Sequence, residues 1–374
     1  MPILPGSTLG LLGGGQLGRM FVTAARAMGY EVIVLDPDPN SPAGSMATEH
    51  LQNKYDDEDS LNYLKLHCDV ITTEFENIPV TSLESLSQEL PVHPSPEAVL
   101  IAQNRIREKS FIQSLGLSTS PFITLETEQD LNQVDDFKFP AILKTSSLGY
   151  DGKGQVVCHT AEDVRAAFIE LGTSCILEQR IDLAKEISVV LARSQQGESY
   201  CFPVAENEHV NGILDVSIAP AEISDQLREQ AQHDAMVIAR SLNYCGVLAV
   251  EFFISVKGEL LVNEIAPRPH NSGHYTLDAC YTSQFEQQVR MICGLSSGDV
   301  RLHTPVAMLN LLGDVWPDQG CPEWDRLLDM SAAHLHLYGK KHARIGRKMG
   351  HINFLSESVN TAKSLLSEAR TNLK

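Results

Sequence analysis

Two glutamates, Glu251 and Glu264, stand in apolar segments at residues 246–254 and 259–264, on either side of Lys257-Gly258. If Lys257-Gly258 forms a two-residue hairpin turn, Glu251 lies directly opposite Glu264 and both side chains point to the same face. Like charges so placed are destabilising without a counter-ion. Two carboxylates suit a Mg²⁺ ion that bridges nucleotide phosphates. The sequence therefore predicts a magnesium site on this hairpin; a solvent-facing pair, or a turn of different length, is the alternative.

A polar loop follows Glu264 directly and contains Arg268, His270 and Asn271. His270 and His274 are four residues apart, but two prolines and a glycine make this segment a loop, which argues against zinc ligation from one helix face. Arg, His and Asn side chains beside a metal site are typical of a group that handles an anion. Turn formation and capping are the alternative role for this loop.

A glycine-rich loop with the pattern Gly13-x-Gly15-x-x-Gly18 follows an apolar run at residues 8–12, and Asp36 ends the next strand-like segment. Glycines let a backbone approach a phosphate, and the N-terminus of the following helix favours the anion. The motif alone leaves three hypotheses open. These are a dinucleotide site, and hence an NAD-dependent oxidoreductase; a mononucleotide site; or glycines that serve only strand–helix packing.

A second glycine-rich loop, at residues 146–155, lies between two strand-like segments, unlike the phosphate loop that runs from a strand into a helix. Lys144 precedes it and Lys153 lies within it. The pattern favours a flap that closes over phosphates, and a surface hairpin is the alternative. Further on, a short strand ends in Glu178-Gln179, which is suited to offer a backbone edge and a carboxylate to an adenine and a ribose. Glu186 is a second candidate ribose acceptor.

The chain is acidic overall, with 29 Lys and Arg against 48 Asp and Glu and a net charge of −19, which disfavours binding to DNA or RNA. Cations are instead concentrated locally, because residues 330–356 hold no acidic residue. This basic segment is suited to grip a substrate phosphate, and a solvated basic surface is the alternative. Its cations are Lys340, Lys341, Arg344, Arg347 and Lys348.

Two further features indicate the environment of the chain. No apolar run approaches the ~20 residues that span a bilayer, and the N-terminal segment lacks the basic region of a signal peptide. The eight cysteines are scattered, without a Cys-x-x-Cys pair. We therefore expect reduced thiols in a cytoplasmic protein that has no membrane partner.

The elements that must position these residues change in kind along the chain. Up to about residue 97, strand and helix signals alternate in a βαβ rhythm, which predicts a parallel, doubly wound α/β sheet. One helical stretch is predicted over residues 98–115, ending at Gly116. From residue 139 onward, strand hairpins with a few helices are typical of an α+β region. A smaller segment with its own strand signals follows residue 298.

These motifs, in this order, resemble the ATP-grasp superfamily, and within it the family of N5-carboxyaminoimidazole ribonucleotide synthetases of purine biosynthesis. The resemblance spans almost the whole chain. One departure is Leu148, which stands where the family usually has a second glycine. The most specific stretches are GGGQLGRM at 13–20, DPDPNSPA at 36–43, TEFENIP at 73–79, GYDGKGQ at 149–155, VNEIAPRPHNSGH at 262–274, and YGK, GRK and GHIN within 338–353.

The resemblance implies a fold of three regions with α/β and α+β character. An N-terminal Rossmann-like pre-ATP-grasp domain would cover residues 1–97 and bind no NAD. An ATP-grasp domain would cover residues 98–298, with a flexible lid at roughly 120–195. A C-terminal domain at residues 299–374 would pack near the substrate site. The family also implies a homodimer.

The resemblance further implies a role for each matching residue. Glu251 and Glu264 match the magnesium carboxylates, while Arg268, His270 and Asn271 resemble the bicarbonate-handling group, with Lys340 beside them as a catalytic residue. ATP contacts are implied for Arg105, Lys144, Gly149, Tyr150, Asp151, Gly152, Lys153, Gly154, Gln155, Glu178, Gln179, Ile181, Glu186, His209, Asn263 and Glu264. Contacts to the ribonucleotide are implied for Ser41, Glu74, Tyr150, Asp151, Lys153, Lys340 and Arg347.

The reaction that the resemblance implies uses ATP with Mg²⁺, bicarbonate and aminoimidazole ribonucleotide. Bicarbonate attacks the γ-phosphate to give carboxyphosphate, which delivers CO2 to the exocyclic amine, and ADP and phosphate are released. Three rival hypotheses remain: a related ATP-grasp ligase that uses formate and a glycinamide ribonucleotide, an NAD-dependent oxidoreductase, and a non-catalytic nucleotide sensor on the same fold.

Overall fold

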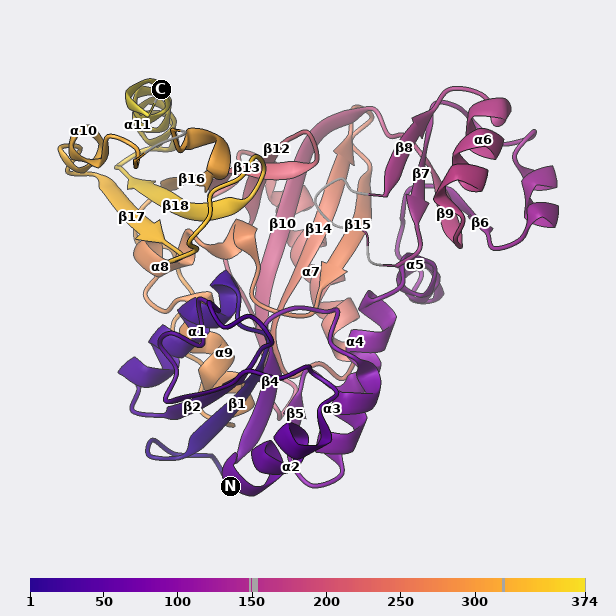
Figure 1. The fold of residues 1–374 in the computed structure, drawn as a ribbon. Coiled ribbons are helices and arrows are strands. Elements are labelled where there is room, and N and C mark those ends of the chain that lie inside the picture. Colours follow the sequence, from indigo (N-terminus) through magenta and orange to yellow (C-terminus); the bar gives the residue numbers. More distant parts are fainter. Residues whose placement is uncertain (148, 150–153, 318–319, 374) are drawn as a thin grey trace.

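The structure, a computed structural model, describes residues 1–147, 149, 154–317 and 320–373. Figure 1 shows an N-terminal region at the bottom, a long central sheet above it, and a small sheet set apart at the upper right. The C-terminal segment lies at the upper left, on the far side of the central sheet from the small sheet. Within the described residues, no helix is long and apolar enough to cross a membrane.

The N-terminal region is the parallel, doubly wound sheet that the βαβ rhythm predicts. Its strands lie in the order β3-β2-β1-β4-β5, and all four pairings are parallel. Because β1 has β2 on one side and β4 on the other, the glycine-rich loop after β1 lies at the point where the strand order reverses, the usual place for a ligand in such sheets. The elements are β1 (Thr8–Leu12), α1 (Gln16–Ala27), β2 (Glu31–Leu35), β3 (Glu49–Leu51), α2 (Glu58–His67), β4 (Val70–Thr73), α3 (Val80–Ser87) and β5 (Val92–His93).

The central sheet runs in the order β15-β14-β10-β12-β13-β16-β18-β17, with β11 paired to β10. Since β13 pairs with β16, the sheet continues across residue 298, where the sequence predicts a division between regions. The strands are β10 (Leu183–Arg193), β11 (Ser199–Cys201), β12 (Ala205–Val210), β13 (Ile213–Ala219), β14 (Gly246–Ser255), β15 (Leu260–Ala266), β16 (Val306–Leu312), β17 (Ala333–Leu337) and β18 (Lys348–Leu355).

Strands β10 and β14 are apolar on both faces because helices cover both. One face packs on α7 (Asp225–Ser241), where Leu248 and Val250 meet Ala235 and Ile238. Residues of the opposite face, among them Val247, pack with helix α9 (Gln284–Ile292). Burial on both sides explains the continuous apolar run that holds Glu251. The remaining elements of this part are η2 (Asn271–Gly273), α8 (Thr276–Ala279), η3 (Gly313–Val315), α10 (Trp324–Leu328) and α11 (Val359–Asn372).

The small sheet has the order β6-β9-β7-β8 and a core of its own with helix α6. Strands β7 and β8 are antiparallel neighbours, so the prediction that the second glycine-rich loop joins two strands is confirmed. The region predicted as a lid also includes β10, but β10 belongs to the central sheet. The elements are β6 (Phe122–Leu125), η1 (Glu128–Gln133), β7 (Ala141–Thr145), β8 (Gln155–Cys158), α6 (Ala161–Leu171) and β9 (Cys175–Gln179).

The single helical stretch predicted over residues 98–115 is wrong, because the structure has two helices there. Helix α4 (Pro96–Ala102) ends and α5 (Arg105–Ser114) begins after Asn104, which has an extended backbone. The Asn104 side chain accepts hydrogen bonds from the backbone N–H of Ile106 and Arg107 at 3.0 and 3.1 Å, which caps α5. The break places Arg105 in the first turn of α5, where its side chain reaches the central sheet.

Candidate active site

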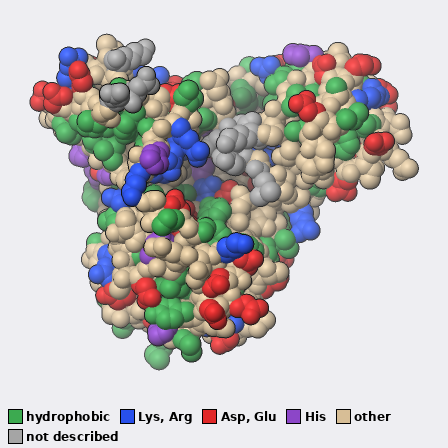
Figure 2. Space-filling view, in the orientation of Figure 1, with side chains coloured by type: hydrophobic (Ala, Val, Ile, Leu, Met, Phe, Trp, Pro, Cys, Tyr) green, Lys and Arg blue, Asp and Glu red, His purple; other side chains and the backbone are tan. Residues whose placement is uncertain are grey.

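Glu251 and Glu264 are direct partners across β14 and β15, so the predicted pairing is confirmed. Both side chains line one cavity of about 950 Å³ between the N-terminal region, the central sheet and the basic segment. Figure 2 shows Lys and Arg side chains gathered at the hollow between the regions. Arg344 and Lys348 of the basic segment line this cavity. So do fifteen residues to which the family resemblance assigns a site role: Glu74, Arg105, Lys144, Gly149, Gln155, Glu186, His209, Glu251, Asn263, Glu264, Arg268, His270, Asn271, Lys340 and Arg347.

The turn that produces this pairing differs from the predicted one. The backbone N–H of Ser255 donates to the carbonyl of Glu259 at 2.9 Å, so the connection has three residues, 256–258, and Gly258 has a φ of +80°. This turn alone would place Glu251 opposite Asn263. A bulge at Asn263 adds one residue to β15 and restores the partnership of the two glutamates.

The two carboxylates differ in their surroundings. Glu251 is buried, and burial together with the charge of Glu264 raises the pKa of its carboxyl. Burial acts in the same direction on Glu264, but the Arg105 guanidinium, 3.2 Å away, together with Lys144 and His209 outweighs burial and lowers the pKa of that carboxyl. The raised pKa of Glu251 indicates that the positive groups around the two carboxylates do not fully balance their negative charge. An oxygen-donor pair with uncompensated charge fits a hard divalent cation such as Mg²⁺.

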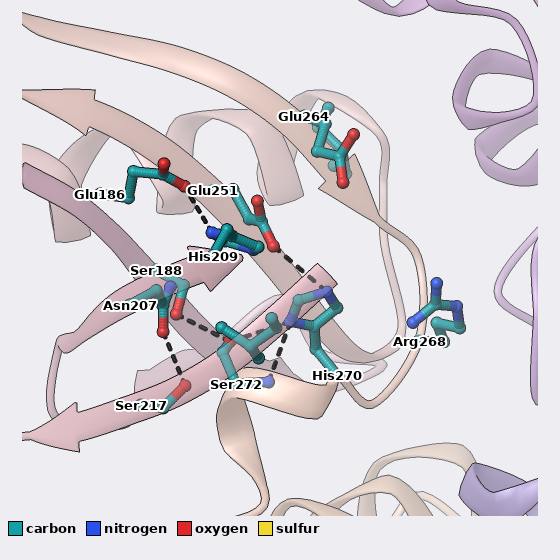
Figure 3. Close-up of polar contacts among 12 residues, drawn as sticks. Glu186, Ser188, Asn207, His209, Ser217, Glu251, Glu264, Arg268, His270 and Ser272 are labelled. Carbon is teal, nitrogen blue, oxygen red and sulfur yellow. Dashed lines mark hydrogen bonds and ion pairs between the residues drawn. The ribbon is translucent and has the colours of Figure 1, made fainter. Parts of the chain in front are cut away.

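Two histidines flank Glu251 (Figure 3). Nδ1 of His209 lies 2.6 Å from Glu186; burial would lower the pKa of His209, but Glu186 and Glu251 outweigh burial and raise it. Nε2 of His270 lies 3.4 Å from Oε1 of Glu251. Burial and the nearby Arg268 hold the pKa of His270 well below its ordinary value. The surroundings therefore favour the protonated imidazolium form of His209 and the neutral form of His270.

A second cavity of about 420 Å³ adjoins the first, and Lys144 lines both. Glu178, Gln179 and Ile181, all predicted from the sequence, line the second cavity. Its apolar lining residues are Ile142, Ile181, Leu183 and Phe253. A pocket with apolar walls next to a strand edge suits a flat heteroaromatic base.

The Glu178 carboxylate is engaged by two buried lysines. Its Oε2 lies 3.1 Å from Nζ of Lys144 and 3.4 Å from Nζ of Lys109. Burial would raise the pKa of Glu178, but the two ammonium groups outweigh burial and lower it to about 2. Lys109 was missed by sequence reasoning. Its signal is the spacing Arg105, Glu108 and Lys109, which puts three charged side chains on one helix face.

The glycine-rich loop after β1 is occupied by the protein's own carboxylate. Glu74 accepts hydrogen bonds from the backbone N–H groups of Gly15 and Gly18 at the start of α1, and a side chain at Gly15 would collide with that carboxylate. Asp36 accepts from the hydroxyl of Tyr55 at 2.7 Å. The positions that a dinucleotide pyrophosphate and ribose would take are therefore filled, which argues against the NAD hypothesis.

Arg268 is held by a partner that sequence reasoning did not single out. Its guanidinium Nε and Nη2 donate to the two carboxylate oxygens of Glu76 at 2.6 and 3.3 Å. Burial would raise the pKa of Glu76 and lower that of Arg268. The attraction between the two charges outweighs burial, so the pKa of Glu76 is lowered, that of Arg268 is raised, and both groups stay charged. The two residues are 192 positions apart, and no local pattern connects them.

The basic segment is tied to the N-terminal region. Nζ of Lys340 donates to Oε1 of Gln16 at 2.6 Å and to the carbonyl of Lys348 at 2.7 Å. Nη1 of Arg347 donates to the carbonyl of His342 at 2.6 Å. Gln16 lines the large cavity with them and was not predicted.

Several predicted residues are not placed in the cavities. Tyr150, Asp151, Gly152 and Lys153 lie outside the described residues, as does Leu148. Among the described residues, Ser41 and Gly154 line neither cavity. The buried Ser41 donates its hydroxyl to the carbonyl of Gly14 at 2.8 Å and so stabilises the first glycine-rich loop.

Comparison with known proteins finds three family models along the chain. The ribonucleotide synthetase preATP-grasp domain matches residues 7–103, the ATP-grasp domain matches residues 110–285, and the phosphoribosylaminoimidazole carboxylase C-terminal domain matches residues 306–365. The N5-carboxyaminoimidazole ribonucleotide synthase of Bacillus subtilis (strain 168) is 45% identical over 358 residues, covering 95% of this chain and 93% of the relative.

Solved structures agree with these matches over nearly the full length. The ADP complex of an N5-carboxyaminoimidazole ribonucleotide synthetase is 42% identical, with a TM-score of 0.92 and coverage of 98% of this chain and 97% of that one. An N5-carboxyaminoimidazole synthase from Aspergillus clavatus, in complex with ADP and 5-aminoimidazole ribonucleotide, is 28% identical, with a TM-score of 0.90 and 98% coverage of both chains. The chain therefore belongs to the N5-carboxyaminoimidazole ribonucleotide synthase family, whose members are ATP-dependent ligases with an ATP-grasp domain.

Proposed function

We propose that the chain carboxylates 5-aminoimidazole ribonucleotide to N5-carboxyaminoimidazole ribonucleotide in purine biosynthesis, with ATP and bicarbonate consumed and ADP and phosphate released. The observation that carries this proposal is the paired carboxylates of the buried Glu251 and the partly exposed Glu264, which face a large cavity adjoined by a smaller pocket suited to a base. The structures of relatives with ADP and with 5-aminoimidazole ribonucleotide support the same substrates.

In this proposal the adenine lies in the smaller cavity, between Ile142 and Phe253, and the triphosphate extends past Lys144 into the larger one. Lys144 lies at the junction of the two cavities. Arg105, from the first turn of α5, faces the same space beside Glu264. The second glycine-rich loop would then cover the phosphates and exclude water, which otherwise hydrolyses carboxyphosphate.

Glu251 and Glu264 would hold Mg²⁺, with nucleotide phosphate oxygens and water completing its shell. When bound, this ion neutralises charge on the transferring phosphoryl group. Asn263, the bulged residue of β15 that precedes Glu264, also lines the large cavity and is suited to contact the nucleotide. Arg105, which is paired with Glu264, and Lys144 supply further positive charge in the same cavity.

Bicarbonate would be received by Arg268, His270 and Asn271. Both side-chain amide atoms of Asn271 are buried without a hydrogen-bond partner in the described part of the chain, although Asn271 lines the cavity. Unpartnered buried amide atoms indicate a polar ligand. A bicarbonate oxygen held there attacks the γ-phosphorus, and the bond from phosphorus to the β-phosphate oxygen breaks. The carboxyl group of the resulting carboxyphosphate passes to the exocyclic amine, phosphate leaves, and the amine loses one proton.

The ribonucleotide phosphate would be gripped by Lys340 and Arg347, on the loop between β17 and β18. We expect Lys340→Ala and Arg347→Ala each to raise the KM for the ribonucleotide about tenfold or more, since one charge-assisted hydrogen bond is worth ~1.5–3 kcal/mol. The KM for ATP should change less than about twofold, because the nucleotide lies on the other side of the glutamates. Steady-state kinetics with each substrate varied in turn measures both.

Lys341→Ala is the matched control for these variants, because Lys341 is exposed on the same loop and does not line the cavity in the described structure. A rise in the KM for ATP, with that for the ribonucleotide unchanged, would place the ribonucleotide elsewhere. Glu74, beside Gln16 at the same wall of the cavity, is a further candidate contact of the sugar.

The test of the reaction itself is phosphate release from ATP–Mg²⁺ with different partner substrates. Bicarbonate with aminoimidazole ribonucleotide should give sustained release and carboxylated product. Formate with glycinamide ribonucleotide should give none, which separates this chain from the related ligase. Nucleotide binding without turnover under any combination would instead support the sensor hypothesis.

We further propose that the chain acts in the cytoplasm as a homodimer. All eight cysteines are free thiols, six of them buried, as a reducing compartment permits. The homodimer is the assembly that the family resemblance implies. Sedimentation of the purified chain at several concentrations measures its assembly.

A further inference from the structure

The two ring nitrogens of His270 have different partners (Figure 3). Nδ1 accepts a hydrogen bond from the backbone N–H of Ser272 at 3.3 Å and lies 2.8 Å from the hydroxyl oxygen of the same residue. Nε2 faces the cavity side and lies 3.4 Å from Oε1 of Glu251. One ring nitrogen, Nδ1, is therefore bound by Ser272, and the other, Nε2, faces Glu251, a proposed metal carboxylate.

The backbone of His270 is fixed independently by Gln284 on α9. The Gln284 amide accepts from the His270 N–H at 2.9 Å and donates to the His270 carbonyl at 2.7 Å, and its side chain is fully buried. With the backbone held in this way, the ring's orientation and protonated nitrogen are what Ser272 determines.

Hydrogen-bond direction assigns the proton on the ring. A backbone N–H can only donate, so Nδ1 must present its lone pair to Ser272, and the single proton of a neutral imidazole then lies on Nε2. Ser188 on β10 donates its hydroxyl to that of Ser272 at 2.7 Å. This leaves the Ser272 proton to point at Nδ1. Ser188 and Ser272 are 1% and 0% exposed, so water does not compete for these bonds.

We infer that Ser188 and Ser272 are positioning residues that hold His270 as the Nε2–H tautomer, with its N–H on the side of Glu251 and the cavity. In this state His270 donates a hydrogen bond to an anion oxygen. The other tautomer would turn a lone pair toward the carboxylate of Glu251 and toward any bicarbonate oxygen, and would repel both. The role of His270 toward bicarbonate rests on the proposed function. The assignment of the tautomer is independent of the proposed function.

Nitrogen NMR of the whole protein labelled with ¹⁵N-histidine reads the tautomer directly. The chain has 13 histidines, and the His270 signals are identified by their loss in His270→Gln. We expect Nδ1 of His270 to carry no proton and Nε2 to carry one. Observation of the proton on Nδ1 in the wild-type protein would overturn the inference, whether or not the protein carboxylates its ribonucleotide.

Serine variants connect the tautomer to turnover. Ser272→Ala keeps the backbone N–H at 3.3 Å but removes the hydroxyl hydrogen bond at 2.8 Å, the shorter of the two bonds that face Nδ1. Ser272→Ala and Ser188→Ala should therefore shift His270 toward a tautomer mixture and lower kcat about tenfold or more, the usual effect of removing a group that orients a functional histidine. The KM for ATP should stay unchanged. Ser188→Ala also serves as the second variant if Ser272→Ala does not fold.

Ser217→Ala is the matched control. Ser217 is a fully buried serine of the same sheet, and its hydroxyl donates to Asn207 at 2.8 Å without contacting His270 (Figure 3). This variant should change neither the tautomer nor kcat. If Ser272→Ala and Ser188→Ala match Ser217→Ala in kcat, or lose kcat with the His270 tautomer unchanged, the inference is wrong. If the wild-type protein shows the expected tautomer but no carboxylation, the proposed function fails instead.

Discussion

Replacing Glu264 with alanine is expected to reduce bicarbonate-dependent ATP cleavage by about 10³-fold or more while the protein stays folded. The substitution removes one of the two proposed metal carboxylates. Metal stabilisation of a transferring phosphoryl group is worth several kcal/mol, and each 1.36 kcal/mol is a factor of ten in rate. Glu264 opens to the cavity, with 38% of its side chain exposed, so its removal leaves no packing defect. Glu251→Gln should have a similar effect on turnover.

Calorimetry separates the metal role from a general loss of binding. In the wild-type protein we expect Mg²⁺ to increase the affinity for ATP, and in Glu264→Ala we expect that increase to disappear. Glu208→Gln, at an exposed position on β12, is the matched control and should behave as the wild-type protein. Turnover of Glu264→Ala near the wild-type rate would contradict the metal role of the pair.

Glu178→Gln is expected to lower the free energy of unfolding by about 3–5 kcal/mol, because it leaves the buried ammonium groups of Lys109 and Lys144 without a counter-ion. The double variant Lys109→Met with Glu178→Gln should recover part of this loss, since one buried charge is then removed. Urea unfolding followed by circular dichroism measures both. Glu206→Gln is the control, because its partner Lys185 is partly exposed, and such pairs contribute ~1 kcal/mol or less.

The same carboxylate predicts an acid limit for stability. The folded pKa of Glu178 is lowered to about 2, from 4.5, so its contribution is fully present above pH 4.5 and is lost as the pH falls toward 2. The wild-type protein should therefore lose more stability over this range than Glu178→Gln does. Parallel pH dependence of the two proteins, or an unfolding free energy unchanged by Glu178→Gln, would refute the counter-ion role.

The site could be predicted from sequence where strand register determined it. Two errors cancelled at the hairpin: the turn is one residue longer than predicted, and the bulge at Asn263 returns Glu264 to face Glu251. Hairpin arithmetic therefore found the right pair through the wrong turn. The parallel N-terminal sheet was predictable because βαβ periodicity is local.

The parts that sequence missed depend on contacts between distant segments. Glu76 meets Arg268 across 192 positions, and Gln16 meets Lys340 across 324; neither pair has a periodic signature. The break between α4 and α5 was missed because a capping asparagine stands inside an apolar pattern that continues on both sides. Gln284 carries no sequence signal either, since its function is to bind the backbone of another loop.

The continuous central sheet connects the two groups of residues that we propose to bind the nucleotide and the ribonucleotide. Glu251 and Glu264 stand on the strands at one end of its path, and the loop with Lys340 joins the strands at the other end, yet all line the same cavity. The sheet must therefore curve around this cavity, as the accumulated twist of its strands allows. If Lys340 and Arg347 hold the ribonucleotide as proposed, strand register sets their distance from the two glutamates. A slip of one residue between β13 and β16 would then move these two residues by roughly 3.3 Å relative to Glu251 and Glu264.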